Sequence, residues 1–268
     1  MYDAFAISDD TVLLAYGAAG LRVFLLSSKK VSSQPPAAIR DVYRVAYDSA
    51  TDTLVLLVRP ENSATRKYWV LVTMQSRGSK WIEVARYNTT ISPESDLNIA
   101  VCGTQGIYSP YAKGAENTAR WFRITAERTL DDWTLYSFPS SIHGLACIVS
   151  GGNTEFAFAF ESEVIAYMSD PGPGKLKESW RVALNAPLRL LFYGHKKLLV
   201  TRWNSDTNTH DILSLHESGY LMLSRMKEHP FLLPDNSRFL VRAWTLAGRK
   251  LVLVDQNSII AITENFHY

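Results

Sequence analysis

The sequence has little of what marks a membrane protein or a nucleic-acid-binding protein. No apolar run in its 268 residues approaches the length of about 18 residues that a membrane-spanning helix needs. The 28 basic and 26 acidic side chains leave a net charge of +2, without the strongly basic stripe typical of nucleic-acid binders. We therefore expect neither a membrane span nor a nucleic-acid partner.

Motifs that carry catalysis are also absent. The chain contains no Gly-x-Ser-x-Gly elbow, Walker loop, His-Glu-x-x-His pair or Cys-x-x-Cys pair. His210, His216 and His229 fall close together in the sequence, but His210 and His216 bracket a predicted strand and would emerge at its opposite ends. We predict no catalytic residue, no cofactor and no metal site, and expect that the protein is not an enzyme.

Cysteine is scarce, since Cys102 and Cys147 are the only two. Each lies in an apolar run, so small buried thiols are the expected interpretation, and one disulfide is an open alternative. The N-terminal residues Met-Tyr-Asp-Ala-Phe-Ala lack the basic and apolar regions of a signal peptide. One sequon, Asn88-Thr89-Thr90, would matter only in a secreted protein. The expectation is an intracellular, cytoplasmic protein.

What the chain does contain is a recurrence of short β-type runs from one end to the other, with Gly, Pro, Asn, Asp and Ser in the gaps. No long stretch shows helical periodicity. One apolar run of each group serves as a marker, and the markers are spaced by 42, 53, 49, 42 and 53 residues. This period matches a four-stranded propeller blade of about 40 to 50 residues. The markers are Val12, Leu54, Ile107, Phe156, Leu198 and Leu251.

Tryptophan follows the same period. Trp81, Trp133 and Trp180 begin three similar segments that lie 52 and 47 residues apart. We label the strands of a blade a, b, c and d from the axis outward, and each Trp then falls on strand d of blades two, three and four. A large ring there fills the space between blades, so these residues are predicted to be structural.

On this period and strand rhythm the chain resembles a strongly degenerate WD40-type β-propeller. The family's Trp-Asp dipeptide is missing, and the only Gly-His, Gly194-His195, has no Trp-Asp downstream. The predicted fold is an all-β propeller of about six four-stranded blades, forming one domain over residues 1–268. A pair of β-sandwiches is the alternative.

The two ends of the chain bear on how such a propeller closes. Blade one begins directly at its strand a, residues 3–8, and the last group lacks strand d. The N-terminus has no spare strand to complete that last blade. Two hypotheses follow: the blades close by packing alone, or the chain is part of a longer protein.

Long polar connections collect on the end of the blades where the b–c and d–a loops emerge, as expected where function sits on loops over a rigid frame. Within the segment His-Pro-Phe-Leu-Leu-Pro, the apolar residues would either cap the core or form a partner-binding knob. The favoured function is a non-enzymatic scaffold that binds protein partners through this loop face. Its candidate residues are Phe231, Leu232, Leu233, Arg66 and Tyr111.

The rival function uses the central strands. Arg44, Arg189 and Arg242 would line the channel, but no acidic residue accompanies them within those strands. Arginines without a carboxylate favour binding of a small anion or an acidic peptide over hydrolysis. A hydrolase-like propeller enzyme remains part of this alternative.

Overall fold

A computed structural model shows that the regular elements of the chain are β-strands. It describes residues 1–32, 38–60, 68–77, 80–93, 95–111, 117–169, 175–206, 209–222, 243–248, 250–254 and 259–263. Every element in these ranges is a strand, which confirms the predicted all-β class. No helix able to span a membrane occurs in this part of the chain.

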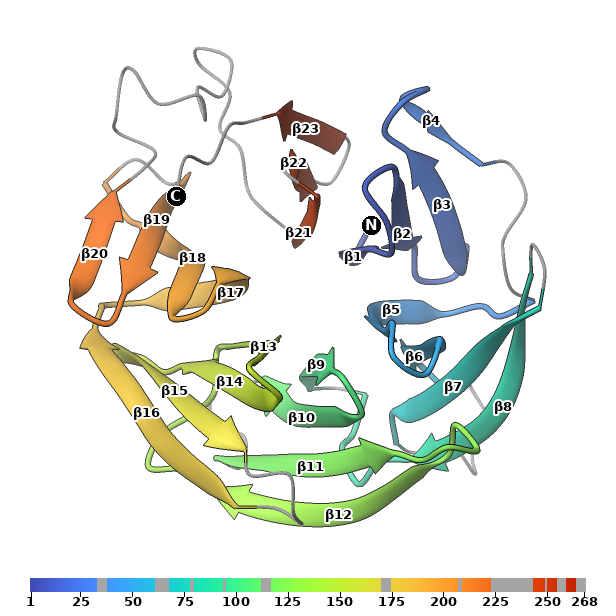
Figure 1. The fold of residues 1–268 in the computed structure, drawn as a ribbon, viewed down its shortest axis with the longest axis horizontal. Coiled ribbons are helices and arrows are strands. Elements are labelled where there is room, and N and C mark those ends of the chain that lie inside the picture. Colours follow the sequence, from blue (N-terminus) through green and yellow to red (C-terminus); the bar gives the residue numbers. More distant parts are fainter. Residues whose placement is uncertain are drawn as a thin grey trace. The chain divides into compact units, whose positions relative to one another are not determined.

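The strands form six antiparallel sheets, each made of consecutive strands in chain order (Figure 1). Five sheets have four strands, and the sixth has three within the described ranges. Five blades are therefore complete where about six were predicted, and the three-stranded one is the blade expected to be incomplete. The simple meander of each sheet is the topology of a propeller blade.

The first three sheets have the following bounds. Sheet one contains β1 (Asp3–Ala6), β2 (Thr11–Ala15), β3 (Leu21–Leu25) and β4 (Lys30–Val31). Sheet two contains β5 (Val42–Asp48), β6 (Thr53–Val58), β7 (Val70–Arg77) and β8 (Lys80–Asn88). Sheet three contains β9 (Asp96–Cys102), β10 (Gln105–Tyr111), β11 (Thr118–Ile124) and β12 (Leu130–Ser137).

The last three sheets continue the series. Sheet four contains β13 (Gly144–Ser150), β14 (Asn153–Ala159), β15 (Glu163–Ser169) and β16 (Leu176–Ala183). Sheet five contains β17 (Pro187–Gly194), β18 (Lys197–Asn204), β19 (Thr209–His216) and β20 (Gly219–Met222). Sheet six contains β21 (Ala243–Ala247), β22 (Lys250–Val254) and β23 (Ile259–Thr263).

These sheets fall into two compact units. Unit 1 comprises Met1–Ser95, Arg123–Asp131 and Arg242–Tyr268, and unit 2 comprises Asp96–Phe122 and Asp132–Val241. Sheets one, two and six thus belong to unit 1, together with the tip of the β11–β12 hairpin. The rest of sheet three and sheets four and five belong to unit 2. The single domain expected over residues 1–268 stays a prediction.

Within unit 1, the core lies between neighbouring sheets. Apolar residues of sheets one and two form one buried cluster, which includes Leu13, Leu54 and Val72. A second cluster joins sheet six to sheet one through residues such as Val12 and Val252. The Ala6 backbone N–H also donates to Thr245 Oγ1 at 2.9 Å. Among the described residues, the first and last sheets therefore meet by packing and share no strand. Both closure hypotheses stay predictions.

Within unit 2, the same kind of packing joins sheets three to five. The cluster between sheets three and four contains Ile107, Phe156 and Phe158. The cluster between sheets four and five contains Trp180, which is 7% exposed, beside Leu190 and Phe192. These clusters show why each strand has one apolar row: burial of flat sheet faces against each other supplies most of the stabilising free energy.

The tryptophans lie on strand d, as predicted, although the strands begin earlier than expected. Trp81 is the second residue of β8, Trp133 the fourth of β12 and Trp180 the fifth of β16. The three polar residues 177–179 precede Trp180 in β16 and are exposed, because this strand is the outer edge of its sheet. An edge strand exposes its side chains, so its start carries no apolar signal in the sequence.

The cysteines correct an expectation. Cys102 at the end of β9 and Cys147 in β13 form a disulfide, with 5.9 Å between their Cα atoms. The interpretation as two buried thiols is therefore wrong. Both residues lie on the first strands of neighbouring sheets, and packing of these sheets brings them within the distance that a disulfide spans.

Candidate protein-binding surface

Metal-binding clusters are not found in the described ranges. No three His, Cys, Asp or Glu side chains in this part of the chain are grouped so as to hold a metal ion. His210 and His216 stand at opposite ends of β19, as the sequence predicted.

The candidate residues of the loop face are only partly described. Phe231, Leu232, Leu233 and Arg66 lie outside the described residues, so their role stays a prediction. Tyr111 is the last residue of β10, a second strand, and its backbone thus stands at the b–c end of sheet three. The strand bounds leave long connections at this end, such as 59–69 and 89–95, whereas a–b turns such as 103–104 and 195–196 are short.

The structure describes two of the three arginines of the rival function, which belong to different units. Arg44 lies in β5 of unit 1, where its Nη1 donates to the carbonyl oxygens of Tyr2 at 3.2 Å and Tyr43 at 3.1 Å. Arg189 lies in β17 of unit 2, and burial together with the nearby Arg189 charge lowers the pKa of His210. Arg242 lies outside the described residues.

Arg44 lies beside a group of aromatic side chains at the b–c/d–a end of sheets one and two. We name this group, Tyr2, Tyr43, Arg44, Tyr68 and Trp69, the aromatic patch. The ring centroids of Tyr2 and Tyr43 lie 4.4 Å apart, and those of Tyr43 and Trp69 lie 5.2 Å apart in an edge-on arrangement. Tyr2 is 38% exposed and Tyr68 is 46% exposed. The patch therefore exposes the side chains of Tyr2 and Tyr68 to solvent, while its other aromatic rings pack against one another.

Local backbone geometry explains why Tyr2 lies where it does. Gly17 and Val42 form an isolated antiparallel bridge that links the b–c turn of sheet one to the start of β5. The Tyr2 ring packs over Gly17, where a Cβ atom would meet it at 2.7 Å. Gly17 also has a φ of +60°, a conformation that favours glycine. A residue with a side chain at this position would displace the Tyr2 ring.

Trp69 supplies the buried base of the aromatic patch. It is 3% exposed, and its indole Nε1 donates to the Ser95 carbonyl at 2.7 Å. Its backbone N–H donates to the Ile91 carbonyl, and its carbonyl accepts from the Thr89 N–H. These contacts tie the b–c and d–a connections of sheet two together. The patch is therefore held by hydrogen bonds on rigid elements, which is a requirement for a preorganised binding surface.

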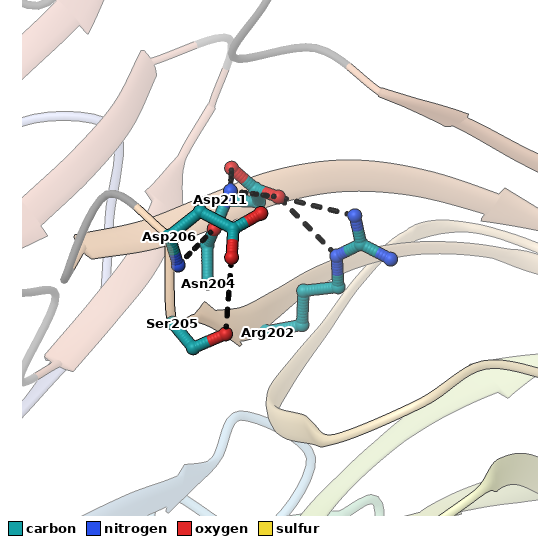
Figure 2. A network of polar contacts seen from close by, with 5 residues as sticks. All are labelled: Arg202, Asn204, Ser205, Asp206 and Asp211. Atoms are coloured by element: carbon teal, nitrogen blue, oxygen red, sulfur yellow. Dashed lines mark hydrogen bonds and ion pairs between the residues drawn. The ribbon is translucent and has the colours of Figure 1, made fainter.

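A second polar feature marks the b–c end of sheet five, in unit 2 (Figure 2). Asp211, which is 5% exposed, accepts from Arg202 Nη2 at 3.2 Å and from Asn204 Nδ2 at 3.2 Å. The Asp206 N–H in turn donates to Asn204 Oδ1. All of these bonds join β18, β19 and the turn between them. The network satisfies a buried carboxylate and so fixes the ends of these strands, which is a structural role.

Comparison with known proteins supports the fold. No family model matches the chain, and no curated protein matches it. Among solved structures, the β-propeller domain of Cps50 (Swd1) from Myceliophteria thermophila is similar, with a TM-score of 0.58 and 10% identity over 98% of this chain and 83% of that one. A protein from Lactobacillus plantarum has a TM-score of 0.56 and 15% identity, over 95% of this chain and 82% of that one. The chain thus has a β-propeller fold, as the repeat period predicted.

Most of the aromatic patch was not predicted from the sequence. Arg44 was noted, but as part of a channel, and Tyr2, Tyr43 and Trp69 lie far apart in the chain. One signal was available: Tyr2 and Tyr43 both stand at the start of the first strand in consecutive blades, so the repeat alignment places them at equivalent heights. The contact of Tyr43 with Trp69 depends on the b–c connection and has no such signal.

Proposed function

We propose that the chain is a non-enzymatic interaction module that binds a protein partner through the b–c/d–a end of its blades. The observation that supports this proposal is the aromatic patch, in which the exposed Tyr2 packs on Tyr43 and Tyr43 packs on the buried, hydrogen-bonded Trp69. The exposed Tyr68 directly precedes Trp69 in the chain. Tyrosine, tryptophan and arginine are enriched among the residues that dominate protein–protein binding energy. Their rigid rings add contact area at low cost in conformational entropy.

The sequence places the other candidate residues in or beside b–c and d–a connections. Residues 59–67, which contain Arg66, lead directly to Tyr68, and Tyr111 ends β10. Phe231, Leu232 and Leu233 belong to the connection between sheets five and six, and we include them as apolar contacts. The proposal needs no cofactor or metal. The alternative, an anion site or enzyme built on Arg44, Arg189 and Arg242, is not favoured by the described contacts of Arg44, whose Nη1 donates to two backbone carbonyl oxygens.

Alanine variants of the two exposed tyrosines test the proposal. Tyr2→Ala and Tyr68→Ala would be compared with Tyr220→Ala, a matched control that is 49% exposed on β20 of unit 2. A partner is identified by cross-linking from a photoreactive residue at position 68, purified, and titrated against each variant. Loss of a dominant side chain costs about 2 kcal/mol, or about 30-fold in Kd. Unchanged Kd for both patch variants, with native circular dichroism, would refute the proposed surface.

A further inference from the structure

Both cysteines of the chain are used in one bond. The sequence contains two cysteines, and the disulfide between Cys102 and Cys147 leaves no free thiol. Both residues are only partly buried, so a reductant can reach them. Disulfides of this kind are reduced in the cytosol and persist in secretory and extracellular compartments. The bond therefore indicates that the chain folds in an oxidising compartment.

N-linked glycosylation also takes place in such a compartment, and the sequon at residues 88–90 is a candidate acceptor there. Asn88 is the last residue of β8, the outer strand of sheet two, and its side chain is exposed. Thr90 is exposed as well, whereas Thr89 between them is 4% exposed. Asn88 and Thr90 are therefore both accessible from solvent, although the strand ends at Asn88. No hydrogen bond engages the Asn88 side-chain amide in the described part of the chain.

Because Asn88 lies on the outer strand of sheet two, the space beside this strand can hold an oligosaccharide. β8 pairs with β7 alone, so no further strand covers its outer side within sheet two. Thr89 instead faces inward, and its Oγ1 accepts from the Ile91 N–H at 3.2 Å. This contact holds the connection after Asn88 in place without using either outward residue of the sequon. A glycan on Asn88 would therefore displace no packed group of sheet two.

From the disulfide and this geometry together, we propose that Asn88 is N-glycosylated in a secretory compartment. In the reaction, a lipid diphosphate-linked oligosaccharide is the donor. The bond from its first sugar carbon to the diphosphate oxygen breaks, a bond from that carbon to Asn88 Nδ2 forms, and the amide loses one proton. The lipid diphosphate leaves, and nothing is oxidised or reduced. A secretory location replaces the expected cytoplasmic one, and this proposal does not rest on the proposed binding function.

Peptide mass spectrometry of the protein from the cells that make it tests both parts at once. Trypsin releases residues 87–113 as one peptide, because no lysine or arginine lies between Arg86 and Lys113. This peptide contains both Asn88 and Cys102, and Cys147 lies in the peptide 129–175. After alkylation without reduction, we expect the two peptides to remain linked. Treatment with peptide N-glycosidase in heavy-oxygen water should convert Asn88 to labelled Asp.

Variants of the full chain separate the sequon from effects on folding. Asn88→Gln and Thr90→Val remove the acceptor or the required hydroxyl, and should abolish the gel-mobility shift that the glycosidase reverses. Thr90→Ser keeps a hydroxyl and should keep the shift, which makes it the matched control. The proposal is overturned if peptide 87–113 carries unmodified Asn88 in the native protein, whatever the state of the cysteines. Alkylated, unlinked Cys102 would equally overturn it.

Discussion

Trp180 is expected to stabilise the protein through one buried hydrogen bond in addition to its apolar area. Its Nε1 donates to Glu155 Oε1 at 2.7 Å, and the two residues are 7% and 0% exposed. The second carboxylate oxygen, Oε2, has no hydrogen-bond partner among the described groups, and it lies 3.6 Å from Nδ1 of His195. The change Trp180→Phe would remove the one hydrogen bond that this buried carboxylate accepts from a described donor.

Two effects of Trp180→Phe are expected to lower the free energy of unfolding. A buried acceptor left without its donor costs about 1–3 kcal/mol, and a charged acceptor costs more. The smaller phenyl ring leaves a gap between sheets four and five, where Trp180 packs near Leu190 and Phe192. That gap adds about 1 kcal/mol. We therefore expect Trp180→Phe to lower the free energy of unfolding by about 3–4 kcal/mol.

Trp81 provides the matched control, since it also lies on strand d of its sheet. It is only partly buried, and its ring meets Tyr47 edge-on at 5.7 Å. No hydrogen bond to its indole nitrogen is found among the described residues. Trp81→Phe should therefore cost less than about 1 kcal/mol. Urea denaturation followed by far-UV circular dichroism measures both losses without relying on tryptophan fluorescence.

A double variant isolates the hydrogen bond. Replacing both partners of a buried bond by apolar groups can be nearly neutral, so Trp180→Phe combined with Glu155→Met should be more stable than Trp180→Phe alone. Equal losses for Trp180→Phe and Trp81→Phe would refute the reasoning, because the indole would then act only as apolar filling.

Three further changes test other parts of the structure. Gly144→Ala would put a methyl group against the backbone carbonyl of Leu188, so we expect a loss of about 1–3 kcal/mol in urea denaturation, and an unchanged midpoint would contradict this close approach. Ala186 has a φ of 52°, which strains any residue with a Cβ, so Ala186→Gly should raise stability by ~0.5–1 kcal/mol; a loss would show that the turn adopts another conformation. Burial raises the pKa of Tyr108 to about 12 from 10, so its contribution is complete below pH 10 and is lost as the pH rises toward 12. Wild type should therefore lose about 1 kcal/mol more than Tyr108→Phe between pH 8 and pH 11, and parallel curves would argue against this titration.

The elements that the sequence predicted best are those with a buried row of apolar residues. β6, the second strand of sheet two, is buried along its whole length, and the run Leu54–Val58 already identified it. β16 was predicted to begin at Trp180 and begins at Leu176, because the polar residues 177–179 that precede Trp180 are exposed on an edge strand. Local hydrophobic alternation reports burial, so it fails where a strand has no buried face.

The functional residues were harder to predict than the strands. The aromatic patch joins Tyr2, Tyr43 and Trp69 from three separate segments. The contacts that bring the first two together include the bridge between Gly17 and Val42 and the hydrogen bond from Arg44 to the Tyr2 carbonyl. No composition or spacing rule reports a contact between a chain terminus and a b–c connection. The candidate arginines were chosen by their strand, which does not say what a side chain contacts.

The sequence by itself determined the all-β class, the repeat period and the positions of most strands, because these depend on alternation and turn residues within a few positions of each other. Only the tertiary structure decided which distant residues meet. It paired Cys102 with Cys147, placed Glu155 against Trp180, and set Tyr43 between Tyr2 and Trp69. Each of these contacts depends on how neighbouring sheets pack, and the free energy of that packing comes from whole faces and not from any local pattern.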